Sequence, residues 1–245
     1  MITFSPQLVS HSIVFLAFLF SCFPAWSQHV IVHENVHFES AHSGNGILIA
    51  APHAASDKNT GKIALGIARI LGAGYLVVTA RGDTIRRTNV NRPSEKERFG
   101  SAEIWTDRSE SVYLRYLDLI RSSSNMPLRA YIEIHGHGDH RLRNVVEVAS
   151  IGLTSNQANR MKDAFESAYE DGAGYLARNM GLVVRVEPTD RLRYQASASK
   201  RIGVLSERIS TLSLHVELPT MARELRSSAV TESLIAAMVR AVVSY

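Results

Sequence analysis

The chain is poor in cysteine. Cys22 is its only one among 245 residues, and it lies in an N-terminal segment that we expect to be removed. A disulfide scaffold, a cysteine nucleophile and a thiolate metal site are therefore excluded from the mature protein. The chain also lacks the G-x-S-x-G elbow of serine hydrolases, which argues against a metal-independent esterase. Any metal site must be built from histidine, aspartate and glutamate.

The chain also lacks a block of like charge. The formal net charge is +4, but the basic residues are scattered as pairs such as Arg141/Arg143 and Arg191/Arg193. This pattern favours a small acidic substrate or a cell-wall polymer over nucleic acid, and no stable protein partner is predicted. Composition is ordinary for a globular protein, with 45% hydrophobic and 20% charged residues. The length predicts a single domain over residues 28–245.

The first 27 residues differ from the rest of the chain. The apolar run SIVFLAFLFSCF is followed by Pro24 and by the small-x-small triplet Ala25-Trp26-Ser27. This pattern predicts a signal peptide over 1–27 and a periplasmic or secreted protein, because the run is too short to span a bilayer comfortably. A retained N-terminal anchor is the alternative. In a further variant, Leu19-Phe20-Ser21-Cys22 resembles a lipoprotein box, in which Cys22 would carry the lipid.

After the leader, nearly continuous apolar runs alternate with helical patterns. The runs are typical of strands covered on both faces, and strands separated by helices indicate βαβ units. The sequence therefore predicts an α/β fold, a three-layer αβα sandwich around a mixed, mostly parallel sheet. The expected strands are 46–52, 75–80, 129–136, 144–150, 182–188 and 212–219, and the expected helices are 60–72, 103–123, 155–180, 199–210 and 220–243.

Three potential metal ligands lie at or just after the ends of predicted strands, where α/β proteins collect ligands. His53 and Asp57 follow the first strand, and His135 ends the strand in YIEIHGHGD. Imidazole and carboxylate suit zinc, and catalytic zinc usually keeps three protein ligands and one open position. His137 competes with His135 for the third place. Glu133 shares a strand face with His135 and could hold its imidazole.

A base for a metal-bound water is expected at the end of another strand. Glu217 closes LSLHVELP, and His215 points to the same side and could support it. The alternative for Glu217 is a structural glutamate paired with an arginine. Each histidine or aspartate taken alone could equally be a loop or capping residue. Their common position at strand ends favours the functional interpretation.

A substrate-binding segment is expected within the long polar stretch from Gly82 to Gly100. Asn91 and Arg92 could grip a substrate carboxylate, because a guanidinium matches its two oxygens. Arg86 and Arg87 could add charge, or could be solvated loop residues. A further group of histidines at positions 29, 33, 37 and 42 is expected to form a solvent-facing edge, with the first three on one face.

The motifs APHAASD, NVNRP, IEIHGHGD and HVELP, in this order, resemble the N-formylglutamate amidohydrolase-like group and the phage-type poly-γ-glutamate hydrolases. These are zinc enzymes similar in fold to zinc carboxypeptidases. The resemblance implies one zinc ion held by His53, Asp57 and His135, with Glu217 as general base and Asn91 and Arg92 on a substrate carboxylate. Asp57 departs from the pattern, where glutamate is more common, so its loop must approach the metal more closely.

The resemblance predicts a zinc-dependent amidohydrolase or carboxypeptidase-like metallopeptidase. An exported chain favours an amide bond of an external peptide, polyglutamate or cell-wall fragment over a cytoplasmic catabolic substrate. The alternative is a non-catalytic envelope protein that binds metal through its histidines or an anionic polymer through its arginines. The substitution Glu217→Gln separates the two, because an enzyme would keep zinc and lose turnover.

Overall fold

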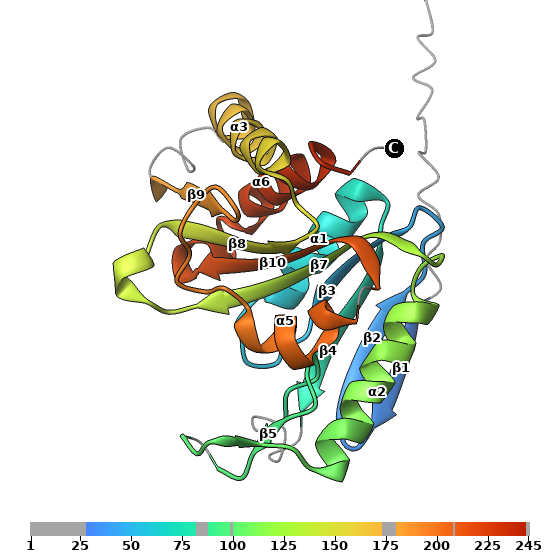
Figure 1. Cartoon of the computed structure of the whole chain (residues 1–245). Coiled ribbons are helices and arrows are strands. Elements are labelled where there is room, and N and C mark those ends of the chain that lie inside the picture. Colours follow the sequence, from blue (N-terminus) through green and yellow to red (C-terminus); the bar gives the residue numbers. More distant parts are fainter. Residues whose placement is uncertain (1–27, 82–87, 99, 173–179, 208, 244–245) are drawn as a thin grey trace, which may run out of the picture.

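The computed structural model of the protein describes residues 28–81, 88–98, 100–172, 180–207 and 209–243 (Figure 1). Its centre is an eight-stranded mixed sheet in the order β1-β2-β4-β3-β7-β10-β8-β9. Strands β4, β3, β7 and β10 are mutually parallel, β10 pairs antiparallel with β8, and β8 pairs parallel with β9. The predicted mixed α/β sheet is therefore confirmed.

The strands follow the apolar runs of the sequence closely, and every residue of β3 is buried. The sheet consists of β1 (Gln28–His33), β2 (Val36–Ala41), β3 (Ile47–Ala51), β4 (Gly74–Arg81), β7 (Leu128–His137), β8 (Val145–Ile151), β9 (Val183–Val186) and β10 (Ser210–Pro219). A separate small hairpin pairs β5 (Glu95–Lys96) with β6 (Glu103–Ile104).

Helices cover both faces of the sheet, which makes three layers (Figure 1). One face packs against α1 (Thr60–Leu71), α3 (Ser155–Gly172) and α6 (Ser228–Arg240). The other face packs against α2 (Asp107–Ser122) and the segment after α5 (Ser197–Ile202), which includes the 3-10 turn η2 (Val204–Ser206). Two further 3-10 turns are η1 (His140–Leu142) and η3 (Thr220–Arg223).

Local sequence explains where the helices begin and end. In α2, Thr106 caps the helix, because its side chain accepts from Ser109 N and the Ser109 side chain accepts from Thr106 N, both at 3.0 Å. Thr154 caps α3, because its hydroxyl accepts from Gln157 N at 3.3 Å. Gly72 ends α1 in the left-handed conformation, φ 61°.

Three predicted helices are shorter than expected. The helix predicted over 103–123 begins only at Asp107, because Thr106 caps it and Glu103–Ile104 pairs as strand β6. The pattern over 199–210 forms the short α5 followed by η2, and the pattern over 220–243 forms η3 and then α6 from Ser228. In these two regions a turn interrupts the helix, because the turn is hydrogen-bonded to another segment. In the first region, Val204 N donates to Asn91 O at 2.9 Å. No helix in the described ranges is long and apolar enough to cross a bilayer.

The N-terminal histidine segment forms a β-hairpin that the sequence pattern did not reveal. Glu34 and Asn35 both have positive φ, 49° and 62°, and make the tight turn between β1 and β2. The turn pairs His33 with Val36 and places His37 opposite Val32. His37 therefore lies on the other face of the hairpin from His33, and the expected single histidine face is wrong. His33 Nε2 lies 2.8 Å from Ser111 Oγ on α2.

Candidate metal centre

The candidate centre forms where three neighbouring parallel strands end. Strand β7 lies between β3 and β10, and the register sets Glu217 opposite His135 and His215 opposite Glu133. Because side chains opposite each other in a sheet share a face, these four side chains form a square at the carboxyl ends of β7 and β10. The candidate residues on these strands therefore lie together at the strand ends, as the sequence predicted.

The three expected metal ligands come together. One ligand atom from each of His53, Asp57 and His135 lies within 4.8 Å of the other two. Asp57 Oδ2 is 3.9 Å from His135 Nδ1, and the rings of His53 and His135 meet edge to face with centroids 4.9 Å apart. Two imidazoles and a carboxylate are a donor set that suits zinc.

Glu133 is the most heavily bonded side chain of the site. It is fully buried. Its carboxylate accepts from the Tyr131 hydroxyl at 2.9 Å, from Asn91 Nδ2 at 3.3 Å, and from His135 Nε2 and His215 Nδ1 at 3.1 Å each. The hydrogen bond that the sequence suggested between Glu133 and His135 is thus present, whereas the other three donors were not anticipated.

These contacts decide which nitrogen of His135 is available. Burial alone would raise the pKa of Glu133, but the hydrogen bonds from His135 and His215 outweigh it and hold that pKa far below its ordinary value. An ionised carboxylate can only accept, so His135 donates its Nε2–H to it. The lone pair of His135 then lies on Nδ1, which faces Asp57. A carboxylate bonded to the far nitrogen is the usual support of a metal-bound histidine.

His215 links the two glutamates. Its Nδ1 lies 3.1 Å from Glu133 Oε2 and its Nε2 lies 3.2 Å from Glu217 Oε1. Burial lowers the pKa of His215, but the bonds to Glu133 and Glu217 raise it to about 9. Its ring stacks on His135 with centroids 4.0 Å apart. The predicted support of Glu217 by His215 is therefore present as a hydrogen bond.

Glu217 keeps one carboxylate oxygen free. Oε1 is bonded to His215, while Oε2 is buried and forms no hydrogen bond with any described residue. Burial raises the pKa of Glu217, but the hydrogen bond from His215 and the charge of that residue lower it below the ordinary value. Glu217 is therefore an ionised acceptor with an unused lone pair beside the three candidate ligands.

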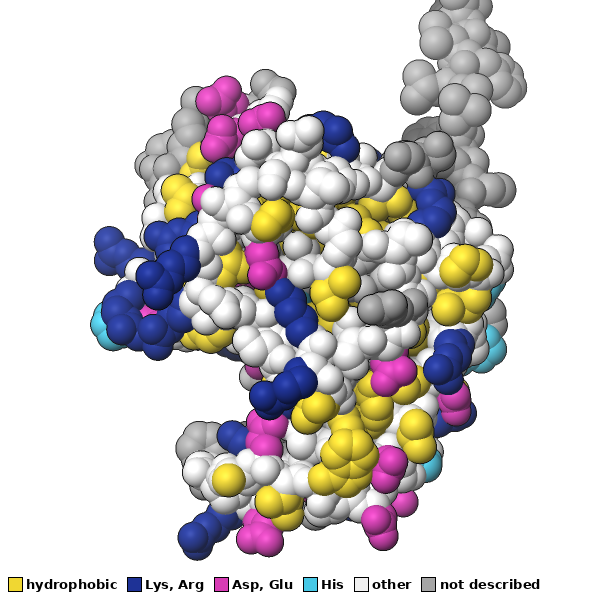
Figure 2. All heavy atoms as spheres, in the orientation of Figure 1, with side chains coloured by type: hydrophobic (Ala, Val, Ile, Leu, Met, Phe, Trp, Pro, Cys, Tyr) yellow, Lys and Arg dark blue, Asp and Glu magenta, His cyan; other side chains and the backbone are white. Residues whose placement is uncertain are grey.

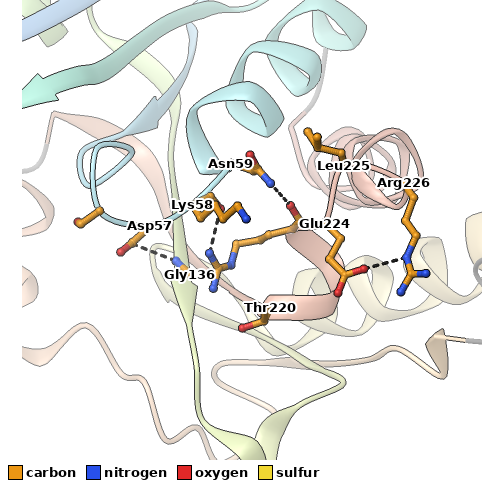
Figure 3. A pocket seen from close by; sticks show the side chains of 10 residues that line it. Asp57, Lys58, Asn59, Gly136, Thr220, Glu224, Leu225 and Arg226 are labelled. Atoms are coloured by element: carbon orange, nitrogen blue, oxygen red, sulfur yellow. Dashed lines mark hydrogen bonds and ion pairs between the residues drawn. The ribbon is translucent and has the colours of Figure 1, made fainter.

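Asp57 is held in place by the backbone of β7. Gly136 N donates to Asp57 Oδ2 at 3.1 Å (Figure 3). Burial raises the pKa of Asp57, and His135 and the Gly136 N–H partly offset that rise. A Cβ on Gly136 would lie 2.5 Å from the guanidinium of Arg223. Gly136 is thus required for the close approach of Arg223 to β7, which explains why a glycine follows His135.

Arg223 ties the loops around Asp57 together. Its side chain donates to the carbonyls of Leu218, Lys58 and His137 at 2.9 to 3.2 Å. Asn59 returns a bond from its side-chain amide to the Arg223 carbonyl at 2.7 Å (Figure 3). Burial lowers the pKa of Arg223. No sequence pattern indicates this arginine, because its partners are backbone carbonyls, two of them in distant segments.

A cavity of about 450 Å³ opens over the centre. Asn91 and Arg92 line it, but their side chains bind protein carboxylates: Asn91 Nδ2 donates to Glu133, and Arg92 is bonded to Glu103 through Nε at 3.0 Å and Nη2 at 2.7 Å. This differs from the expected Asn-Arg grip on a substrate. Arg92 Nη1 has no hydrogen-bond partner among the described residues. Arg87 lies outside the described residues.

His137, the competing ligand, lies apart from the three candidate ligands. Its Nε2 is 3.1 Å from Val145 O, and its ring stacks on Tyr194 with centroids 5.2 Å apart.

A buried glutamate near Tyr194 was not among the residues expected from the sequence. Glu147, in β8 opposite Glu217, is fully buried and accepts from Arg193 N and Tyr194 N at 3.1 and 2.9 Å. A charged residue within an apolar strand was the available signal.

Exposed arginines gather beside the cavity. Figure 2 shows Lys and Arg side chains crowded at the edge that carries the β7–β8 connection. Arg141, Arg185 and Arg193 belong to this region, with side chains 60%, 46% and 52% exposed. Arg193 also lines the cavity and bonds to Asp139 at 2.7 Å. A positive rim of this kind attracts anionic ligands.

A second combination, Glu133, His135 and His215, also meets the distance requirement for a metal group. Its carboxylate, however, already accepts from four donors, and both ring nitrogens of His215 are bonded to glutamates. Within the described part of the chain, by contrast, no hydrogen bond occupies Asp57 Oδ1 or His135 Nδ1. The donor chemistry therefore favours the expected three ligands for a metal ion.

Comparison with solved structures supports the fold. An Agrobacterium tumefaciens gene product aligns over 80% of this chain and 89% of its own, with 16% identity and a TM-score of 0.50. A bacteriophage poly-gamma-glutamate hydrolase aligns over 85% of this chain and 89% of its own, with 11% identity and a TM-score of 0.46. A Shewanella amazonensis protein described as a "putative metallopeptidase" aligns over 89% and 87%, with 10% identity and a TM-score of 0.47.

No protein-family model and no curated protein matches the sequence. At these identities the likeness is one of fold.

Proposed function

We propose that the protein is an exported, zinc-dependent hydrolase that cleaves an amide bond in a substrate with an acidic group. The observation that carries this proposal is the state of His135. Its Nε2 is bonded to Glu133, while its Nδ1 faces Asp57 at 3.9 Å and belongs to a set of three ligand atoms within 4.8 Å. His53, Asp57 and His135 would hold one zinc ion. When bound, zinc polarises a carbonyl and lowers the pKa of water.

Glu217 is the residue that moves the proton. His215 holds Glu217 Oε1, which fixes the carboxylate on its strand, and Oε2 has no partner among the described residues. Because its pKa is lowered, Glu217 is ionised at neutral pH and can accept a proton from the attacking water. The same carboxyl group can then donate that proton to the leaving amine.

An arginine is proposed to anchor the acidic group of the substrate. Arg92 keeps Nη1 available while Glu103 holds its other two nitrogens, so the guanidinium is fixed at the cavity wall. The exposed arginines of the rim would draw an anionic substrate toward the cavity. Arg87 remains a candidate for the same role. The bond is proposed to be a peptide, N-acyl amino acid or γ-glutamyl amide, in a cell-wall or polyglutamate fragment.

Export is proposed from residues 1–27. Cleavage after Ser27 would leave Gln28, the first residue of β1, as the new terminus. Intact-mass analysis of the protein recovered from a bacterial periplasm tests this directly. A mass corresponding to residues 28–245 supports the signal peptide, a lipidated mass starting at Cys22 supports the lipoprotein alternative, and the full-length mass contradicts both.

Metal analysis followed by a substrate screen tests the function. Purified protein is analysed for zinc and then assayed on N-acyl amino acids, γ-glutamyl peptides and peptidoglycan fragments. We expect about one zinc per chain, and we expect His53→Ala and His135→Ala to lose both zinc and hydrolysis. His140→Ala, an exposed histidine near the same loop, is the matched control and should retain both. A His53→Ala/His135→Ala protein that is zinc-loaded and active would reject the assignment.

A further inference from the structure

Besides Glu217 Oε2, two further polar atoms of residues that line the 450 Å³ cavity are buried and form no hydrogen bond with any described residue. They are Asn91 Oδ1 and Ser199 Oγ. Asn91 is only 1% exposed, and Ser199 is only 3% exposed. Leaving a buried polar atom unpaired costs free energy, so such atoms in a cavity wall point to a ligand that pairs with them.

The orientation of the Asn91 amide is fixed by Glu133. Both carboxylate oxygens of Glu133 lie 3.3 Å from Asn91 Nδ2. The reversed amide would set its oxygen against an ionised carboxylate, which excludes that orientation. Asn91 therefore offers the cavity only an acceptor. An acceptor repels a substrate carboxylate and attracts an N–H group, contrary to the role expected for Asn91 from the sequence.

Ser199 and Asn91 lie on segments that are packed against each other at Gly203. A Cβ on Gly203 would lie 2.4 Å from Asn91 O and 2.9 Å from Ser199 Cα. Gly203 N donates to Ser199 O at 3.0 Å, and Val204 N donates to Asn91 O at 2.9 Å. The backbone thus holds the two unpaired atoms in one rigid part of the wall. A hydroxyl can donate as well as accept.

We propose that Asn91 Oδ1 and Ser199 Oγ form a subsite for an amide group of the substrate. The amide N–H donates to Asn91 Oδ1, and the amide carbonyl accepts from the Ser199 hydroxyl. This inference rests on the proposed function, because it assigns the substrate of the same cavity. It adds that the protein recognises an amide group of the substrate as well as its acidic group.

Binding of two matched probes tests the subsite. N-acetyl-L-glutamate has the amide, and 2-acetoxyglutarate replaces its N–H with an ester oxygen while keeping both carboxylates. We expect the protein to bind the amide probe about five- to tenfold more tightly, as measured by calorimetry on the metal-free protein and on the zinc-loaded Glu217→Gln variant, which does not turn the probe over. Equal affinity for the two probes, or binding of neither, overturns the proposal.

Ser199→Ala separates recognition from structure. Removing an unpaired hydroxyl should leave the melting temperature unchanged or higher, while the affinity for both probes falls several-fold. Ser123→Ala is the control, because Ser123 is also 3% exposed but donates to Leu119 O at 2.6 Å. The control should melt at a lower temperature and bind both probes like the wild type. If Ser199→Ala behaves like Ser123→Ala, the hydroxyl is structural and the proposal is wrong.

The two proposals can fail separately. Probe binding to the metal-free protein requires no turnover. A protein that prefers the amide probe but neither holds zinc nor hydrolyses any amide would reject the proposed function and keep the subsite. A zinc-loaded, active protein that does not distinguish the probes would keep the function and reject the subsite.

Discussion

Two buried glutamates on neighbouring strands differ in how completely they are bonded. Glu133 on β7 accepts from four side chains, whereas Glu217 on β10 accepts from His215 alone and keeps Oε2 without a partner among the described residues. His215 touches both. A saturated carboxylate can fix its neighbours but cannot take part in proton transfer, and an unsaturated one can. We infer that Glu133 organises the site and that Glu217 performs the chemistry.

The largest expected effect separates the two glutamates by activity. Glu217→Gln removes the proton acceptor while preserving shape and the contact with His215. Turnover should fall about 10²- to 10⁴-fold, with zinc content and melting temperature close to those of the wild type. Steady-state kinetics on a substrate identified by the screen, with metal analysis of the same sample, checks this. Retained turnover would return Glu217 to a structural role and favour a binding protein.

The opposite response is expected at Glu133. Glu133→Ala leaves four buried donors without their acceptor, so the free energy of unfolding should fall by about 3–5 kcal/mol. Urea denaturation of the metal-free protein measures this. As a comparison, Glu224→Ala breaks an exposed pair with Arg226 and should cost at most about 1 kcal/mol. A stable Glu133→Ala protein would contradict the organising role.

The support of Asp57 is tested with two glycines of the same motif. Gly136→Ala places a methyl group 2.5 Å from the Arg223 guanidinium, whereas a Cβ on Gly138 meets nothing within 4 Å. Displacement of β7 should loosen the Gly136 N–H bond to Asp57, and zinc affinity should fall about 10- to 100-fold in Gly136→Ala. Competition with a zinc-binding dye measures this. Equal affinities in the two variants would show that the Gly136 bond does not support the metal group.

The smallest expected effect is a dependence of folding stability on pH, which arises from His215. Its pKa of about 9 in the folded protein exceeds the ordinary histidine value of 6.5, so the folded protein holds this proton more tightly. The stabilisation is complete below pH 6.5 and is lost as the pH rises through about 9. The slope is at most about 1.4 kcal/mol per pH unit. Urea midpoints of the metal-free protein should decline over this interval, and the decline should be weaker in His215→Gln.

Much of the fold could be predicted because its signals are local. The apolar runs that form β3, β7 and β10 are continuous, and the parallel arrangement brings their carboxyl ends together. His53, Asp57, His135 and Glu217 could therefore be grouped from their positions alone. The hairpin of β1 and β2 was missed, because its histidines obscure the alternation of apolar residues and its turn is formed by Glu34 and Asn35.

The contacts that distinguish the two glutamates could not be predicted. The donors of Glu133 come from β7, from β10 and from Asn91 in a separate loop, and only the register of β7 with β10 sets His215 opposite Glu133. Arg223 binds backbone carbonyls, which leave no pattern in the sequence. Asn91 was expected to face a carboxylate of the substrate, and instead it binds a carboxylate of the protein.

The position of a bound zinc ion is the most direct test of whether His53, Asp57 and His135 form the metal site. A crystal of the zinc-loaded protein, measured on both sides of the zinc absorption edge, would locate the ion by its anomalous signal. We expect one ion bound by His53, Asp57 and Nδ1 of His135, with Glu133 still bonded to Nε2. An ion held between Glu133 and His215, or no ion at all, would contradict it.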